Sequence, residues 1–299
     1  MQSTRYSLQS WAILIILALI WGSSFILMKQ GLKVFNGTQV GALRLSIAAI
    51  CVLPIAILSF KKIERRHIGP LLIVGFLGNG LPAFLFATAQ TRLASAQAGI
   101  LNGLTPFFVF VIGAVFFQLK PNLRSVSGVV LGFLGAAGLI LSRQTGEAGL
   151  PPMGHSLLIV LATLFYGISA NVISHRCKGL KSYQISSVAL SFILLPALAV
   201  LMYSGAPHVL STVPGAGKAL GYIFVLAVFG TAIAVILFNK LLSETSAMFG
   251  SSVTYLMPIV AVIWGLADGE ALRWVQGLFT LLILSGIYLV NYQPKKVDY

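Results

Sequence analysis

The sequence has 299 residues, of which 58% are hydrophobic and only 9% are charged, and its mean hydropathy is +0.95. Soluble domains carry about 25% charged residues, so this composition excludes a soluble globular protein and predicts a membrane protein. The chain has 20 Lys and Arg against 6 Asp and Glu, a net charge of +14. Because the charges lie in short gaps between apolar runs, we expect them to set membrane orientation and expect no nucleic-acid partner.

Ten segments are long and apolar enough to span a bilayer, which takes about 20 mostly apolar residues. They are residues 11–28, 40–60, 68–88, 95–117, 125–141, 155–174, 183–203, 218–238, 245–267 and 274–291. No small-residue cleavage site follows the first segment, so we interpret it as a spanning helix and not as a removed signal peptide. The gaps are too short for an extramembrane domain. The predicted fold class is therefore an all-α membrane protein with ten transmembrane helices.

The distribution of basic residues predicts the orientation of these helices. With the N-terminus inside, the cytoplasmic gaps and tails hold thirteen Lys and Arg and the opposite gaps hold six. The strongest single signal is the run KKIERRH at residues 61–67. By the positive-inside rule, we expect both termini on the cytoplasmic side of the cell membrane.

The fourth and ninth segments indicate an internal repeat. Residues 96–117 align with residues 248–269 at one fixed offset, which continues upstream without a gap. The matches at this offset include Pro106 on Pro258, Gly113 on Gly265, Gly78 on Gly230, Leu85 on Leu237 and Phe86 on Phe238. Leu and Phe coincidences carry little weight in apolar sequence, but two glycine pairs and a proline pair at one offset favour two copies of one unit.

Five spans per copy is an odd number, so the second copy would enter the membrane upside down relative to the first. Inverted repeats of this kind place a substrate site at their interface, near the middle of the bilayer. We divide the chain into a first repeat at residues 1–142, a polar linker at residues 143–154 and a second repeat at residues 155–299. The linker contains Gly and Pro, as a connecting loop should.

Several short motifs are similar to those of a known family. The run LIWGSSF at residues 19–25 resembles the opening motif of the EamA family, in the drug/metabolite transporter superfamily, and ALRL at residues 42–45 resembles its second helix. The run from Leu256 through Pro258 to Glu270 resembles the repeated EamA signature, from which Gln118 departs in the first copy. The resemblance covers nearly the whole chain. It implies a ten-helix transporter whose helices one, three, four, six, eight and nine line a central cavity, with helices five and ten peripheral, and a substrate range of small metabolites that includes exported amino acids.

Polar side chains within the spans need an explanation, because hydrocarbon offers them no hydrogen bonds. Under the repeat, an aromatic pair and three polar pairs recur at matching depths: Trp21 with Tyr166, Ser24 with Ser169, Asn79 with Thr231, and Asn102 with Thr254. Thr105 shares a helix face with Asn102 by i, i+3 spacing. We predict that these nine residues line a substrate cavity, where hydroxyls and amides bind polar groups and the two rings stack on the substrate.

The alternative for the polar members of this set is a structural one. Ser, Thr and Asn also hold transmembrane helices together, at about 0.6 kcal/mol each. Burying an unpaired amide costs more than burying a hydroxyl, so Asn79 and Asn102 favour the functional interpretation.

Charged residues near the spans leave further alternatives open. Arg44 lies within the second span and either extends its side chain to the interface or acts as a counter-charge for a substrate carboxylate. No Asp or Glu lies within a span, so we expect facilitated or exchange transport, or coupling that uses no intramembrane carboxylate. Glu270 follows the ninth span, where an ion pair with Arg273 would be structural.

Other features narrow the class of protein. The four histidines and two cysteines have no second ligand at metal spacing, so we expect no metal and no cofactor. The stripe Gly128-x-x-x-Gly132 allows close packing of the fifth helix, within the chain or in a homodimer. The absence of a GxxxxGK[ST] motif excludes primary transport by this chain.

We therefore predict a secondary transporter, in the direction of export, for small organic metabolites such as amino acids, which works by alternating access. Its partners would be a small-molecule substrate and the lipid bilayer. An intramembrane enzyme is one alternative, but no paired carboxylates or Ser/His arrangement support it. A sensor or structural subunit is another, and it would not need matched Asn and aromatic residues in both copies.

Overall fold

The computed structural model describes residues 7–119, 123–141, 153–245, 249–250, 253–270 and 274–291, and within these ranges the chain is helical with no strand. Eight helical stretches are long and apolar enough to cross a bilayer: Leu8–Gly31, Gly37–Phe60, Arg65–Gln90, Ser95–Phe116, Leu123–Leu141, Met153–Arg176, Ser182–Tyr203 and Ala216–Glu244. Shorter apolar helices, Leu256–Ala267 and Trp274–Leu289, occupy the positions of the last two predicted spans. The all-α membrane class is confirmed.

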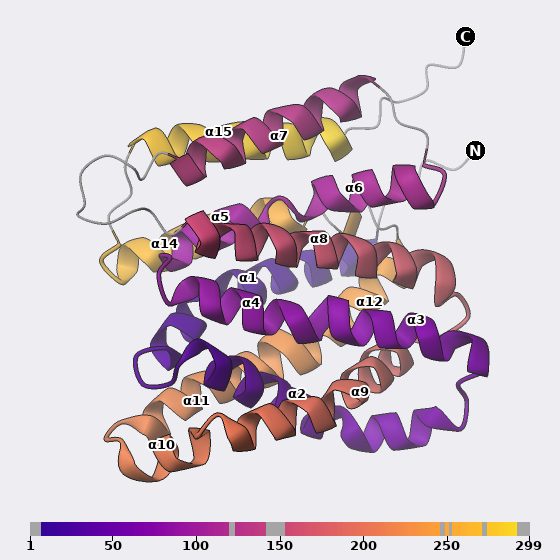
Figure 1. Ribbon diagram of the computed structural model, residues 1–299. Helices are drawn as coiled ribbons and strands as arrows, with labels where there is room; N and C mark the ends of the chain where they lie inside the picture. Colours follow the sequence, from indigo (N-terminus) through magenta and orange to yellow (C-terminus); the bar gives the residue numbers. More distant parts are fainter. Residues whose placement is uncertain are drawn as a thin grey trace.

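The helices pack as a layered bundle (Figure 1). In chain order they are α1 (Leu8–Gly31), α2 (Gly37–Phe60), α3 (Arg65–Gly75), η1 (Phe76–Gly80), α4 (Leu81–Gln90), α5 (Ser95–Asn102), α6 (Thr105–Phe116), α7 (Leu123–Leu141), α8 (Met153–Arg176), α9 (Ser182–Tyr203), α10 (Ala206–Thr212), α11 (Ala216–Ala227), η2 (Val228–Ile233), α12 (Ala234–Glu244), α14 (Val253–Ala267) and α15 (Trp274–Asn291). The short helix α10 was not expected from the sequence. Most of the linker predicted at residues 143–154 lies outside the described residues, and α8 begins within its last part, at Met153.

Three predicted spans are not uniform α-helices. The span predicted at residues 68–88 runs from α3 through the π-helical turn η1 to α4, and the span predicted at residues 218–238 runs from α11 through the π-helical turn η2 to α12. The offset that aligns the repeats also aligns the first residues of η1 and η2, Phe76 and Val228. A π-helical turn inserts one residue into the helix and leaves carbonyls without their usual partners, which is why such turns are frequent at functional sites.

The span predicted at residues 95–117 is broken after Asn102. Gly103 ends α5, and Pro106 lies in the first turn of α6, where its missing N–H costs nothing because the first turn has no intrahelical acceptors for its N–H groups. Pro82 takes the same place in α4, whereas Pro258 lies inside α14.

Helices α7 and α15 lie side by side at one edge of the bundle (Figure 1). A Cβ atom on Gly286 would lie 2.6 Å from the carbonyl oxygen of Gly128 and 2.7 Å from the backbone nitrogen of Gly132. The glycine stripe of α7 therefore serves a backbone contact within the chain, which answers the alternative that the sequence left open for this stripe.

Candidate functional site

A cavity of about 150 Å³ lies between the helices. A water molecule needs about 10–15 Å³ on this measure, so the cavity has room for on the order of ten waters, or for a small metabolite. All ten residues that the sequence singled out line it: Trp21, Ser24, Arg44, Asn79, Asn102, Thr105, Tyr166, Ser169, Thr231 and Thr254. Arg44 lies on α2, as does its neighbour Leu45, which also lines the cavity. The other nine residues come from α1, η1, α5, α6, α8, η2 and α14.

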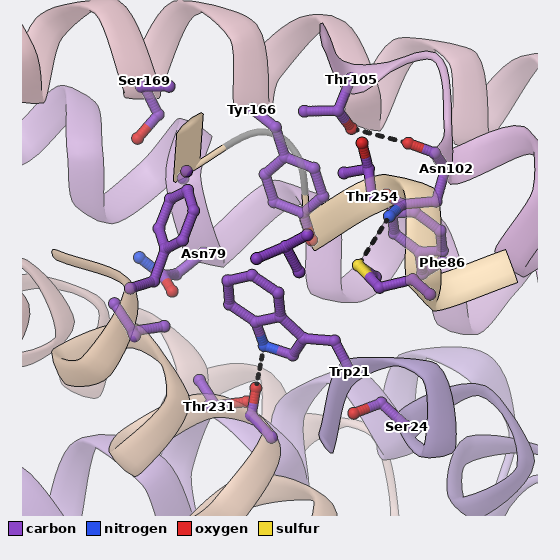
Figure 2. Close-up of a pocket in the computed structure, with 18 of the residues that line it drawn as sticks. Trp21, Ser24, Asn79, Phe86, Asn102, Thr105, Tyr166, Ser169, Thr231 and Thr254 are labelled. Atoms are coloured by element: carbon purple, nitrogen blue, oxygen red, sulfur yellow. Dashed lines mark hydrogen bonds between the residues drawn. The ribbon is translucent and has the colours of Figure 1, made fainter. Parts of the chain in front are cut away.

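Aromatic rings form the body of the cavity wall. Figure 2 shows Trp21 and Tyr166 pointing toward each other from opposite sides. Phe86 stacks on Tyr166 with a centroid distance of 6.0 Å and an interplanar angle of 23°, and Phe238 meets Trp21 edge to face at 5.1 Å. The sequence aligned Phe86 with Phe238, but that match carried no weight there because Phe is common in apolar segments.

Two cavity residues satisfy the irregular backbone of the π-helical turns. Trp21 Nε1 donates to the carbonyl of Gly230 in η2 at 3.0 Å, and Asn79 Nδ2 in η1 donates to the carbonyl of Val74 at 3.3 Å. Each π-helical turn thus has a side chain at the cavity that pairs with a nearby carbonyl. These bonds position the indole and the amide at the cavity wall.

Two buried amides that line the cavity have acceptors without a hydrogen-bond partner among the described residues. Asn102 is 5% exposed, and its Nδ2 has only a weak contact of 3.8 Å with the sulfur of Met257. Asn239 is 1% exposed and donates to the hydroxyl of Ser186 at 2.7 Å. Within the described part of the chain, neither Oδ1 has a hydrogen-bond partner. Because an unpaired buried acceptor is costly, both oxygens are suited to a donor group of a bound molecule.

Asn239 also lines the cavity, and the sequence analysis missed it. It lies in the middle of α12, one residue beyond the end predicted for that span. An amide so close to a predicted helix end gave no reason to expect burial.

The hydroxyl groups of Ser24 and Thr105 fit both a role in helix packing and a role in substrate contact. Ser24 donates to the carbonyl of Ile20 at 2.9 Å, and Thr105 donates to the carbonyl of Asn102 at 2.9 Å. Their hydrogens are therefore used within their own helices, while their oxygens can still accept from a ligand.

Arg44 is half-buried and lines the cavity. Its Nε donates to Thr231 Oγ1 at 2.8 Å, across to η2. The side chain therefore lies at the cavity and does not extend to a membrane interface. This is the placement that Arg44 needs if it acts as a counter-charge for a substrate carboxylate.

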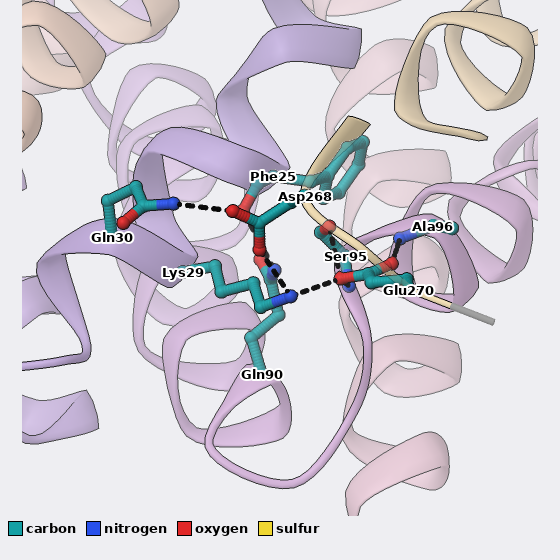
Figure 3. Close-up of polar contacts among 8 residues, drawn as sticks. All are labelled: Phe25, Lys29, Gln30, Gln90, Ser95, Ala96, Asp268 and Glu270. Atoms are coloured by element: carbon teal, nitrogen blue, oxygen red, sulfur yellow. Dashed lines mark hydrogen bonds and ion pairs between the residues drawn. The ribbon is translucent and has the colours of Figure 1, made fainter. Parts of the chain in front are cut away.

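At one end of the bundle, Lys29 lies between two carboxylates (Figure 3). Its Nζ is 2.7 Å from both Asp268 Oδ2 and Glu270 Oε1. Glu270 is thus paired with Lys29, and Arg273, the partner expected from the sequence, lies outside the described residues. The Glu270 carboxylate also accepts from the backbone N–H groups of Ser95 and Ala96 at 2.9 and 3.1 Å.

These contacts lower the pKa of both carboxyl groups. The hydrogen bond from Lys29 lowers the pKa of Asp268 from its ordinary value. Burial raises the pKa of Glu270, but the hydrogen bonds from Lys29, Ser95 and Ala96 outweigh it, so the pKa is lowered. Both groups are therefore ionised at neutral pH and act as acceptors.

Comparison with known proteins agrees with this architecture. The chain matches the EamA-like transporter family twice, over residues 9–141 and 154–292. It is 22% identical over 286 residues to an uncharacterized transporter of Archaeoglobus fulgidus, covering 95% of this chain and 99% of that protein. It is 25% identical over 299 residues to the uncharacterized inner membrane transporter YedA of Escherichia coli, covering 96% and 92%.

Two further similarities extend the comparison. A protein of Chlamydia trachomatis named as an S-adenosylmethionine/S-adenosylhomocysteine transporter is 25% identical over 258 residues, covering 83% of this chain and 78% of that protein. A solved crystal structure superposes with a TM-score of 0.61 over 94% of this chain and 95% of that one, and at 16% identity it shows the shared fold alone. The predicted family and the prediction of a transporter over an enzyme are confirmed.

Proposed function

This chain belongs to the EamA-like transporter family, and we propose that it is a secondary transporter that exports small organic metabolites such as amino acids. It is a multi-pass membrane protein whose relatives are named as transporters. The observation that carries the proposal is the cavity, because it is lined by aromatic and polar residues at paired positions in both halves of the sequence. A cavity at the interface of two repeats is where transporters of this architecture bind their substrates.

The proposed architecture has ten spans in two inverted repeats, residues 1–142 and 155–299, with both termini in the cytoplasm. The matched positions of η1 and η2 support the repeat, since two halves of unrelated structure would not share an irregular turn at the same place. Transport would proceed by alternating access, in which one repeat moves against the other around the cavity.

Substrate contacts are proposed for the ten residues that the sequence selected. Trp21 and Tyr166 would stack on an apolar or planar part of the substrate. Asn79, Asn102 and the hydroxyls of Ser24, Thr105, Ser169, Thr231 and Thr254 would bind its polar groups, with Arg44 as a counter-charge. The relative named for S-adenosylmethionine and S-adenosylhomocysteine, both of which carry an amino-acid group, supports a substrate of this size and polarity.

The mode of coupling follows from the cavity lining. None of the described residues that line the cavity is Asp or Glu. We therefore propose facilitated or exchange transport, because no carboxylate at the cavity could carry a proton with the substrate.

Counterflow in proteoliposomes tests the proposed function directly. Purified protein would be reconstituted with each candidate inside, and uptake of trace radiolabel measured for amino acids, sugars, S-adenosylmethionine and cationic drugs. We expect saturable counterflow of at least one amino acid or related metabolite. Uptake no faster than in empty liposomes for every compound would refute the proposal, and uptake driven by a pH gradient alone would refute the proposed coupling.

Alanine substitutions test the site. Asn79→Ala and Asn102→Ala are expected to weaken substrate binding by about 1–3 kcal/mol, or roughly five- to 150-fold in the apparent affinity, because each removes a buried polar group aimed at the ligand. Asn36→Ser is a suitable control because Asn36 caps α2 outside the cavity and Ser retains the cap. Unchanged kinetics in both alanine variants would assign these amides to helix packing.

A further inference from the structure

Among the described residues that line the cavity, Arg44 is the one that carries a charge. Its bond to Thr231 uses the Nε hydrogen, and within the described residues its Nη1 and Nη2 groups form no hydrogen bond. A guanidinium stays charged throughout the physiological pH range and presents its donors as a fixed planar fork. Four N–H donors of a permanent cation are therefore available at a cavity that contains no opposing charge.

This arrangement needs an anion. A half-buried charge loses part of its hydration and gains from a counter-charge, and pairing with a carboxylate through two parallel hydrogen bonds is the geometry that the fork favours. The described acidic residues, which are Glu64, Glu244, Asp268 and Glu270, lie at or beyond helix ends and not at the cavity. The counter-charge must therefore come from a molecule that enters the cavity.

We infer that Arg44 is the specificity-determining residue of the site and that it binds a carboxylate of the substrate. The rings of Phe86, Tyr166 and Trp21 then contact the apolar or planar part, and molecules whose only charge is positive are rejected because they would oppose the guanidinium. The inference rests on the proposed function, since it names the substrate class of that same cavity. Recognition of a carboxylate applies to organic anions and zwitterions alike.

Ligand-induced thermal stabilisation of the purified protein tests this without a transport assay. A ligand that binds the folded state alone raises the melting temperature by an amount that grows with the logarithm of one plus the ratio of ligand concentration to Kd, so the shift at a fixed concentration reports the affinity. The probes are phenylacetate, its neutral isostere phenylacetamide, phenethylammonium, and sodium phosphate as an inorganic anion. Wild type, Arg44→Gln and Arg44→Lys would be compared. If Arg44→Gln does not fold, Thr231→Val is the second variant, which removes the acceptor of Nε together with one hydroxyl of the cavity wall.

We expect phenylacetate alone to stabilise the wild type, with at least a tenfold weaker effective affinity in Arg44→Gln and an intermediate one in Arg44→Lys and Thr231→Val. The inference would be overturned if phenylacetamide, phenethylammonium or phosphate stabilised the wild type as much as phenylacetate does. It would also be overturned if phenylacetate stabilised Arg44→Gln as much as wild type, or if no probe stabilised the protein. A site for inorganic anions only is the conclusion if phosphate acts as strongly as phenylacetate. Counterflow tests the function separately, so transport by a protein that fails this test would refute the specificity and leave the function standing.

A second inference starts from the contacts around Lys29, which are independent of the cavity lining. Lys29 lies in the last turn of α1, Ser95 and Ala96 begin α5, and Asp268 and Glu270 follow α14, so the cluster joins three elements at one end of the bundle (Figure 3). Glu270 is only 7% exposed and accepts from three groups at the start of α5, including Ser95 Oγ at 2.7 Å. The start of α5 has no cap of its own, because its N-cap residue is Ala94. Glu270 supplies the missing acceptor from the other half of the sequence.

The two residues at the corresponding positions of the other half, Gln118 and Ser174, form no such cluster. The repeat alignment that pairs Pro106 with Pro258 also pairs Gln118 with Glu270, and the alignment that pairs Trp21 with Tyr166 also pairs Lys29 with Ser174. Gln118 is exposed, and neither residue carries a charge. Two halves related by an inverted repeat therefore close their two ends with different strength, because an ion pair with charge-assisted hydrogen bonds is stronger than neutral contacts.

We propose that the Lys29–Asp268–Glu270 cluster is a latch that keeps the outer end of the cavity closed and must open in each transport cycle. Phe25, one helical turn before Lys29 on α1, lines the cavity together with Phe86; they are 6% and 4% exposed, with ring centroids 6.0 Å apart. Separating α14 from α1 and α5 breaks the ion pair and the cap of α5 together. The closed outer end is thus the resting state in the absence of substrate.

Cysteine accessibility tests the latch without knowledge of the substrate. Ser24→Cys places a thiol at the cavity in a background in which Cys51 and Cys177 are replaced by Ser and Ala, and a membrane-impermeant maleimide is added to intact cells. The test variant is Glu270→Gln. The matched control is Glu244→Gln, which removes the carboxylate of an exposed pair with Lys240 at 3.7 Å, outside the cluster.

We expect Glu270→Gln to raise the labelling rate at least tenfold, Glu244→Gln to leave it unchanged, and Lys29→Arg, which keeps the charge, to leave it near that of wild type. If Glu270→Gln does not reach the membrane, Lys29→Met removes the cation while Glu270 still caps α5, and the same increase is expected. An unchanged rate in the folded variant, or an equal increase with Glu244→Gln, would overturn the latch. Because labelling needs no transport, this result is separate from the outcome of the counterflow assay.

Discussion

Gly286→Ala is the most direct test of how α7 and α15 pack. Its new Cβ would lie 2.6 Å from the carbonyl oxygen of Gly128 and within 2.9 Å of the Gly132 backbone. Favourable contacts between heavy atoms lie at about 3.5–4.0 Å, so the helices must separate locally by roughly 1 Å. The three atoms nearest to the new Cβ are all backbone atoms, so no side-chain rotamer change can relieve the clash.

The cost follows from the contacts that this separation weakens. A gap of this size forfeits about a quarter to a half of each contact worth about 0.1–0.2 kcal/mol, so several tens of atom pairs lose about 1–3 kcal/mol. That agrees with the cost of about 1–3 kcal/mol for inserting a methyl group into a packed core. For a chain of this size, the apparent melting temperature should fall by several degrees.

Gly277→Ala provides the matched control on the same helix, because nothing lies within 4 Å of its added Cβ. Both variants would be compared with wild type by thermal unfolding in one detergent. We expect a loss for Gly286→Ala and no loss for Gly277→Ala. Equal melting temperatures for all three proteins would show that the backbones of α7 and α15 are not in contact.

Three further predictions follow from the described contacts. Trp21→Phe keeps an aromatic ring but leaves the Gly230 carbonyl in η2 unpaired, so thermal unfolding should show a loss of about 1–3 kcal/mol. The pKa of Asp268 and of Glu270 is lowered in the folded state, so their contribution to stability is complete at neutral pH and is lost as the pH falls through those lowered values; the melting temperature should fall toward acid pH more steeply in wild type than in Glu270→Gln. Burial raises the pKa of the Cys177 thiol to about 11 and leaves it 2% exposed, so maleimide at neutral pH should label it only after unfolding, and rapid labelling of the folded protein would contradict its placement.

The site illustrates what sequence pattern can and cannot predict. The pairs Trp21 with Tyr166 and Asn102 with Thr254 were found because a polar or large aromatic residue that recurs at one depth in two repeats has few explanations in an apolar segment. Phe86 and Asn239 also line the cavity, but neither stood out. Phenylalanine is common throughout such helices, and an amide near a helix end is normally solvated, so only the packing of neighbouring helices shows that both face the cavity.

The sequence by itself determined the class of the protein, the positions of its apolar helices and most of the polar residues of the cavity, because length, hydropathy and repeat spacing are properties of local segments. It also indicated which residues were unusual for hydrocarbon, among them Arg44. Tertiary structure alone decided that Arg44 bonds to Thr231, that Glu270 pairs with Lys29, and that η1 and η2 interrupt their helices. These features depend on which distant segments meet and on which carbonyls they leave without a partner, and no local pattern along the chain carries that information.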